Sequence, residues 1–139
     1  MPSDAPPPQV WPTLRARDAR GLIRFLVDAF GFVENVAWGD QPDGGGDVVV
    51  HAQLDWPEGG GVMLGDDRPG TSWDRKPGTC GVYVVTADPD ALHARAVAGG
   101  AEIVEGPVDR DYGSRDVIAR DPEGNIWSFG TYPGAPRAS

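Results

Sequence analysis

The sequence has a single cysteine, Cys80, which excludes an intramolecular disulfide and any metal cluster held by several thiolates. It contains no apolar run of the roughly 20 residues that a membrane-spanning helix needs. Its first residues, MPSDAPPPQ, lack the basic start and the apolar stretch of a secretory signal. We therefore expect a cytoplasmic protein with flexible termini over residues 1–8 and 133–139.

Basic residues are also few. The chain has 12 Lys and Arg against 21 Asp and Glu, which gives a formal net charge of −9. Such an acidic surface repels the phosphates of nucleic acids and anionic membranes, so we expect neither as a partner. The charge favours a cationic ligand, although an acidic surface that serves solubility alone is the more common case. With 139 residues, 40% of them hydrophobic, the chain fits one compact domain.

What the sequence does contain is an internal repeat. The order strand, Asp, helix, Gly, strand occurs in residues 13–33 (TLRARDARGLIRFLVDAFGFV) and again in residues 83–103 (YVVTADPDALHARAVAGGAEI). The predicted helix N-caps are Asp18 and Asp88, separated by 88 − 18 = 70 residues. Apolar residues follow each cap at helical spacing, and a glycine ends each helix.

A second matching pair of segments lies downstream, at residues 51–65 (HAQLDWPEGGGVMLG) and 116–130 (DVIARDPEGNIWSFG), with an offset of 116 − 51 = 65. Each is predicted to form a strand, a PEG turn and a strand, which is an antiparallel hairpin. Each half therefore has the order β-α-β-β-β. The predicted fold class is α+β, with a first module at 9–66, a linker at 67–79 and a second module at 80–132.

The segment YGSRDVIARDPEGNIWSFGTY places a DPEGN turn before a strand with two aromatic residues. Together with the doubled β-α-β-β-β order, it resembles the glyoxalase / bleomycin-resistance / extradiol-dioxygenase superfamily, also called vicinal oxygen chelate proteins, and its bleomycin-resistance branch in particular. The resemblance covers residues 9–132. It implies two tandem modules whose curved mixed sheets surround a shared pocket, with the helices outside, and it implies a homodimer.

Alternation of side chains along a strand assigns the faces of the two hairpins. Trp127 and Phe129 form the large apolar face and are expected to pack on a helix, so Ser128 faces the concave side. The repeat places Met63 at the equivalent position, since 128 − 65 = 63. The same alternation directs three polar side chains toward the cavity or its mouth: His51, Gln53 and Asp116.

Members of the superfamily that bind a metal hold it with residues on the first and last strands of each module. The matched motifs carry those four places onto Trp11, Met63, Gly81 and Ser128, with Cys80 as the alternative to Gly81. Tryptophan, methionine, glycine and serine do not form a zinc site or a site for a hard cation. We therefore expect no catalytic metal and no cofactor.

The remaining features favour a flat ligand. Trp11 and Met63 would supply a polarisable apolar wall. His51 and Asp116 would fix the orientation of the ligand, act as a base and its orienting partner, or only hydrogen-bond inside a wet cavity. Trp38 would cover the ligand or a dimer edge. The expected ligand-binding residues are Trp11, Trp38, His51, Gln53, Met63, Tyr112, Asp116 and Ser128.

Other polar and aromatic residues are given structural roles. The mixed charges of RARDAR and DRDYGSRD are typical of a solvated surface, although Tyr112 in the second run is expected at the pocket rim next to the adaptable Gly113. Trp56, before the first PEG turn, and Trp73, in the linker, are expected to pack under their loops or at an interface.

We therefore predict a metal-independent small-molecule-binding protein that sequesters an aromatic natural product or antibiotic as a homodimer, with the net charge favouring a cationic ligand. The alternative is a glyoxalase-like lyase or isomerase that uses a non-standard metal site or a His51/Asp116 acid–base pair. A structural or regulatory module with a vestigial pocket is a third possibility.

Overall fold

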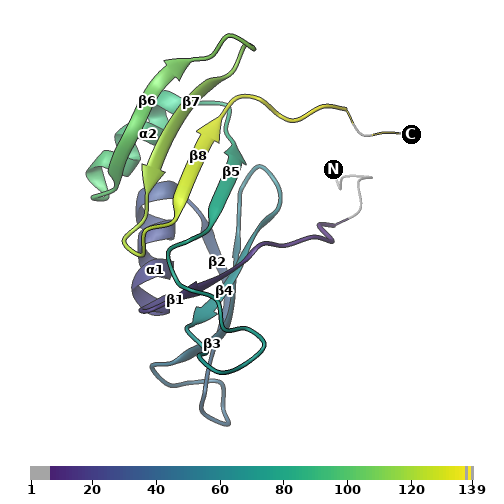
Figure 1. The fold of residues 1–139 in the computed structure, drawn as a ribbon, viewed down its shortest axis with the longest axis vertical. Coiled ribbons are helices and arrows are strands. Elements are labelled where there is room, and N and C mark those ends of the chain that lie inside the picture. The colour runs from purple at the N-terminus through teal and green to yellow at the C-terminus, as the bar shows by residue number, and fades with distance from the viewer. Residues whose placement is uncertain (1–6, 137, 139) are drawn as a thin grey trace.

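The computed structural model describes residues 7–136 and 138, and it consists of two modules with the same order of elements (Figure 1). The first module comprises β1 (Thr13–Ala16), α1 (Ala19–Phe25), the π-helical turn η1 (Leu26–Phe30), β2 (Val33–Gly39), β3 (Val49–Asp55) and β4 (Gly61–Asp66). The second comprises β5 (Gly81–Val85), α2 (Pro89–Ala98), β6 (Glu102–Asp109), β7 (Arg115–Arg120) and β8 (Ile126–Gly130).

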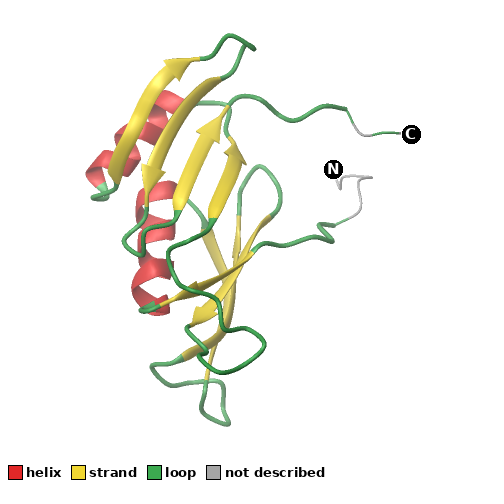
Figure 2. Cartoon of the chain, viewed as in Figure 1, coloured by secondary structure: helices red, strands yellow, loops and turns green. Residues whose placement is uncertain are grey.

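Each module forms one four-stranded mixed sheet, with the strand orders β1-β4-β3-β2 and β5-β8-β7-β6. The first strand of each module pairs in parallel with the last, and the other pairs are antiparallel. Among the described strands, no pairing joins the two sheets into a closed barrel. Both helices lie on the same side of the sheets (Figure 2). The predicted α+β class with two β-α-β-β-β modules is therefore confirmed.

The strand registers reproduce the two offsets of the sequence repeat. Gln53 lies opposite Met63 in the first hairpin, and Ile118 lies opposite Ser128 in the second, so both partners shift by 118 − 53 = 65 and 128 − 63 = 65. In the parallel pairs, Thr13 lies opposite Met63 and Tyr83 lies opposite Ser128, a shift of 83 − 13 = 70. The repeat therefore holds at the level of individual residue pairs.

Both helices begin at the predicted caps. The Asp18 carboxylate accepts the N–H of Gly21 at 3.0 Å, and the Asp88 carboxylate accepts the N–H of Ala91 at 3.0 Å. The first helix continues as η1, a wider turn that carries Phe30, and ends at Gly31. Gly31 has a φ of 91°, a left-handed conformation in which a side chain would be strained.

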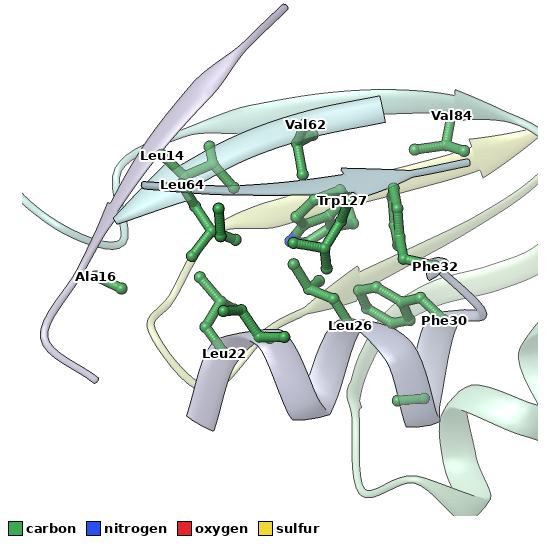
Figure 3. Packing of buried hydrophobic residues seen from close by; sticks show 14 of the residues in the cluster. Leu14, Ala16, Leu22, Leu26, Phe30, Phe32, Val62, Leu64, Val84 and Trp127 are labelled. Carbon is green, nitrogen blue, oxygen red and sulfur yellow. The ribbon is translucent and has the colours of Figure 1, made fainter. Parts of the chain in front are cut away.

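A single hydrophobic core joins the two modules (Figure 3). Trp127 and Phe129 of β8 are fully buried, which confirms the face predicted for them. The rings that cover them belong to the first module: Phe30 lies 4.7 Å from Phe129 between ring centroids, and Phe32 lies 5.5 Å from Trp127. Because aromatic burial dominates the energy of a core, the modules form one packed unit.

The DPEGN turn owes its geometry to the buried carboxylate of Asp121. One oxygen accepts the backbone N–H groups of Glu123, Gly124 and Asn125 at 2.9–3.1 Å. The other accepts the Asn125 amide and the Trp127 indole N–H, both at 2.8 Å. The carboxylate therefore closes the turn and also fixes the orientation of the indole in the core.

The first module has Trp56 at the position equivalent to Asp121, since 121 − 65 = 56. Its indole N–H donates to the carbonyl of Val85 in the second module at 2.8 Å, and its ring lies 4.9 Å from that of Phe32. Trp56, which was expected under its loop or at an interface, thus packs against the core and bonds across the module boundary.

Glutamates of the two PEG turns make reciprocal contacts between the modules. Glu123 accepts the backbone N–H groups of Arg17 and Asp18 at 2.8 and 3.0 Å. Glu58 accepts the N–H of Ala87 at 3.2 Å. The repeat relates these contacts, since 123 − 58 = 65 and 87 − 17 = 70. Each turn thus supplies an acceptor to the chain just before the other module's helix, where helix N–H groups need one.

The connection between the modules runs from the end of β4 at Asp66 to the start of β5 at Gly81 and contains no regular secondary structure. The predicted flexible termini include residues 1–6, 137 and 139, which lie outside the described residues. Within residues 7–136 and 138, no helix has the length and apolarity needed to cross a bilayer.

Replacing Glu123 with alanine should destabilise the fold, because it leaves two N–H groups without the acceptor that a side chain only 7% exposed now provides. We expect the free energy of unfolding to fall by about 1–3 kcal/mol in urea denaturation. Glu102→Ala is the control, because its exposed ion pair with Arg120 should contribute less than about 0.5 kcal/mol. Equal losses in the two variants would contradict the assigned role of Glu123.

Candidate ligand-binding site

A cavity of about 350 Å³ opens on the face of the first sheet that points away from the helices. We call it the first-module cavity. It brings together three of the predicted site residues, Trp11, His51 and Met63, which come from the segment before β1 and from β3 and β4. Its complete lining is Trp11, Thr13, Arg15, Val50, His51, Met63, Arg68 and Trp73.

Two glycines of β4 leave room for the large side chains of this cavity. A Cβ atom on Gly61 would clash with the Leu54 carbonyl oxygen and lie 2.8 Å from Cζ3 of Trp11, and one on Gly65 would lie 2.7 Å from the Val50 carbonyl oxygen and 3.1 Å from Nη1 of Arg15. A larger residue at either position would therefore collide with the β3 backbone and also crowd the indole or the guanidinium. The Trp11 and Arg15 side chains therefore depend on these glycines for their positions.

Arg15 is a site residue that the sequence reasoning missed. It was expected on a solvated surface within RARDAR, and that prediction is wrong, because Arg15 is only 8% exposed. Its Nε donates to the Leu14 carbonyl at 3.1 Å and its Nη1 to the Asp66 carbonyl at 3.4 Å. The sequence did contain a signal: Arg15 follows Trp11 and Thr13 at every second position, so strand alternation places its side chain on the same face as theirs.

The Arg15 guanidinium has no acidic partner within 4.0 Å in the part of the chain that the structure describes. Burial lowers the pKa of Arg15, and the nearby Arg68 guanidinium lowers it further, whereas Asp66 and Asp67 act in the opposite direction. Asp66 instead accepts the N–H groups of Ala19 and Val49 at 2.9 and 2.7 Å. The guanidinium remains charged, because arginine does not deprotonate in proteins.

The connection between the modules completes the cavity. The Thr71 hydroxyl donates to the Arg68 carbonyl at 2.8 Å, and the Asp74 carboxylate accepts the Gly70 N–H at 3.0 Å. This turn holds Arg68 and Trp73 against the cavity, and the Trp73 ring centroid lies 5.8 Å from the Arg15 guanidinium carbon, within the range of a cation–π interaction. Trp73, which was expected under its loop or at an interface, lines this cavity, and no periodic pattern in the linker indicated this.

Trp38 and Gln53 lie on the same sheet but do not line the first-module cavity. Trp38 is 53% exposed on the edge strand β2, directly opposite His51. The backbone of Gly44 packs against its ring, so the loop after β2 covers part of the indole. Gln53 lies beside Met63 and donates to the Asp55 carboxylate at 2.8 Å.

The other predicted site residues lie on the second sheet. Asp116 is buried, and its carboxylate accepts hydrogen bonds from Ser114, from Nε of Arg110 at 3.1 Å and from the Tyr112 hydroxyl at 3.1 Å. Burial alone would raise the pKa of Asp116, but the hydrogen bonds from Ser114, Arg110 and Tyr112 outweigh it and hold the pKa below its ordinary value. Ser128 is half-buried beside Tyr83 and Ile118 on β8.

The acid–base pair predicted as an alternative is therefore not assembled within one chain. His51 lines the first-module cavity, whereas Asp116 bonds to side chains of its own hairpin, and no hydrogen bond joins the two in the described chain. A carboxylate with a lowered pKa and three donors is also a weak base. Asp116 instead holds Tyr112 and Arg110 in place.

A larger cavity of about 490 Å³ lies between the two modules. We call it the intermodule cavity. Its walls include Phe32, Trp56 and Val62 from the first module and residues 82–85 from β5 of the second. It is shared between the modules, as the resemblance implied, but none of the predicted site residues lines it. The intermodule cavity is larger and also contains aromatic side chains and the Glu58 carboxylate. We take the first-module cavity as the candidate because it holds three of the predicted site residues and two arginines.

The four places that hold a metal in relatives carry Trp11, Met63, Gly81 and Ser128 here, and these residues do not fit a zinc ion or a hard cation. No group of three His, Cys, Asp or Glu side chains in the described residues is arranged to hold a metal ion. The donors that the described residues supply at these places therefore do not form a recognisable site for such an ion.

The sequence matches the family model of the Glyoxalase/Bleomycin resistance protein/Dioxygenase superfamily over residues 9–129. No curated protein sequence matches the chain. Among solved structures, TioX from Micromonospora sp. ML1 is 28% identical, with a TM-score of 0.71 over 88% of this chain and 98% of that one.

Two further structures share the fold at lower identity. TnmS3, an antibiotic binding protein from Streptomyces sp. CB03234, is 24% identical, with a TM-score of 0.62 over 84% of this chain and 88% of that chain. A superfamily member from Sphaerobacter thermophilus DSM 20745 is 21% identical, with a TM-score of 0.65 over 88% of this chain and 97% of that chain. The family match and the doubled β-α-β-β-β architecture agree, and the chain belongs to the Glyoxalase/Bleomycin resistance protein/Dioxygenase superfamily.

Proposed function

We propose that this protein binds a flat aromatic small molecule, such as an aromatic natural product or antibiotic, in the first-module cavity without a metal ion. The observation that carries the proposal is the convergence of two indoles, Trp11 and Trp73, with the Met63 thioether around a volume of about 350 Å³. Ligand pockets have volumes of about 300–1,000 Å³ and mainly apolar or aromatic linings with a few polar groups. Aromatic and thioether side chains favour a flat, polarisable ligand.

The likeness to TnmS3, an antibiotic binding protein, extends to the fold, and it supports a binding role for this chain at the level of the family. The enzymatic alternative has less support, because its metal positions lack suitable donors and its proposed acid–base pair is separated. A cytoplasmic location stays a prediction.

We also propose that the protein is a homodimer that presents the second sheet of one copy to the first-module cavity of the other. Three tyrosines of the second module, which we call the tyrosine face, are exposed by 44–65%: Tyr83, Tyr112 and Tyr132. The Tyr112 and Tyr132 rings lie 6.0 Å apart, and the Tyr83 hydroxyl donates to the Tyr132 carbonyl at 2.8 Å. Such amphipathic side chains are enriched in protein interfaces. This arrangement would bring Tyr83, Tyr112 and Tyr132 of one copy toward Trp11, His51 and Met63 of the other.

Replacing Trp11 with leucine should weaken binding of a planar aromatic ligand by at least about tenfold, because stacking area at the cavity wall is lost. Isothermal titration with a panel of intercalating and glycopeptide antibiotics would identify a ligand for the wild type and then measure the loss. Val104→Ala, on an exposed part of β6, is the matched control and should bind like the wild type. If no compound binds the wild-type protein, or Trp11→Leu binds equally well, the proposed site is wrong.

Asp116→Asn should reduce stability but leave binding in the first-module cavity intact. At neutral pH we expect the free energy of unfolding to fall by about 1–3 kcal/mol, because an amide N–H₂ would face donors that now bond a carboxylate. The pKa of Asp116 is lower in the folded protein than in the unfolded chain. The wild type therefore has this extra stability above the unfolded-state pKa and loses it as the pH falls through the folded-state pKa. Thermal melts across acidic pH should therefore show a flatter profile for the variant. Unchanged stability with abolished binding would instead favour a direct ligand contact for Asp116.

The wild-type protein should elute as a dimer, with a mass by light scattering of twice 14.7 kDa. Tyr83→Arg should weaken the dimer, because it places a charge in the tyrosine face. Val97→Arg, on the exposed side of α2, is the control and should leave the mass unchanged. A monomeric wild type, or a dimer broken only by Val97→Arg, would contradict the proposed interface.

A further inference from the structure

The cavity that we assign to the ligand has a local charge opposite to that of the whole chain. The formal net charge is −9, yet the lining includes the guanidinium groups of Arg15 and Arg68 and the imidazole of His51. None of the described residues that line it is acidic. The net charge suggested a cationic ligand, and the local charge does not support that expectation.

Arg15 keeps hydrogen-bonding capacity directed at the cavity. Its Nε and Nη1 donate to backbone carbonyls, whereas Nη2 has no hydrogen bond within the described chain. Every fully buried side-chain nitrogen or oxygen of the described residues has a partner, so Nη2 is not sealed inside the protein. Because Arg15 lines the cavity, this surface of the guanidinium is available to a ligand.

The guanidinium is also positioned by its surroundings. Its Nε and Nη1 donate to the carbonyls of Leu14 and Asp66, and the Trp73 ring centroid lies 5.8 Å from the guanidinium carbon. Gly65 provides the space for the group on β4. Burial of a charge without an opposite charge is unfavourable, whereas a fixed guanidinium is well suited to bind a carboxylate through parallel N–H donors.

We propose that the ligand of the first-module cavity is an anionic aromatic compound, whose carboxylate pairs with Arg15 and Arg68 while its ring lies between Trp11 and Trp73. This inference rests on the proposed function and specifies the chemical class of the ligand. The aromatic part takes the apolar wall, and the carboxylate compensates the buried charge. Arg68, on the connection between the modules, adds long-range attraction that the buried Arg15 alone would not provide.

The test uses three compounds with the same ring and different charge: naphthoate, naphthamide and naphthylmethylammonium. Isothermal titration of the full chain at neutral pH and physiological salt should give an affinity for naphthoate at least about tenfold higher than for the other two. Equal affinities, or a preference for the ammonium compound, would overturn the inference and leave the proposed function standing. If none of the three binds, the proposed aromatic site fails, and the inference fails with it.

Two variants test whether Arg15 and Arg68 cause the preference for naphthoate. Arg15→Met keeps an apolar stem of similar length and should remove the preference for naphthoate while naphthamide still binds. Arg68→Met should reduce the preference, and it serves as the decisive variant if Arg15→Met does not fold. Arg75→Met, in the same connection but outside the cavity, is the matched control and should bind like the wild type. A preference for naphthoate that survives both Arg15→Met and Arg68→Met would contradict the assignment.

Discussion

The packing of two aromatic side chains from each module against each other is the constraint on which the rest of this structure depends. Phe30 and Phe32 of the first module contact Trp127 and Phe129 of the second within one hydrophobic core. The core draws both helices to one side of the sheets and leaves the opposite faces free for other molecules (Figure 2). Polar contacts add direction to this packing, since Asp121 orients the Trp127 indole and the two PEG-turn glutamates bind the chain before the opposite helix.

The two sheet faces that point away from the helices carry different side chains, although the backbone repeat is preserved. In the first module, Gly65 makes room for the Arg15 guanidinium, and the cavity beside it is aromatic and positively charged. In the second, the equivalent Gly130 lies against the Asp116 carboxylate, which its own hairpin saturates with donors. One half of the duplicated fold therefore has a cavity beside a guanidinium that pairs with no acidic group of the described residues, and the other has a structured, tyrosine-rich surface. This difference between equivalent positions supports a binding role for the first face.

The sequence predicted the features that depend on residues close together in the chain, and it missed features that depend on how distant segments meet. The helix caps and the buried face of β8 depend on local geometry and alternation, and they were predicted from Asp18, Asp88, Trp127 and Phe129. The repeat also indicated that Trp11, His51 and Met63 lie close together. Arg15 was missed because a charged residue in a charged run was assumed to be solvated, although its alternation with Trp11 and Thr13 pointed inward. The contributions of Arg68 and Trp73 depend on how an aperiodic connection folds back. The donors to Asp116 are Arg110, Tyr112 and Ser114 of its own hairpin, and the strand alternation that was used to assign the faces does not describe these bonds in the turn.

The proposed function places ligand recognition in the first-module cavity and assigns it to side chains in place of a metal. A crystal structure of the protein with naphthoate tests it most directly. We expect the ring between Trp11 and Trp73 and the carboxylate within hydrogen-bonding distance of the Arg15 guanidinium. A ligand seated only in the intermodule cavity, or a cation bound among Trp11, Met63, Gly81 and Ser128, would contradict the account.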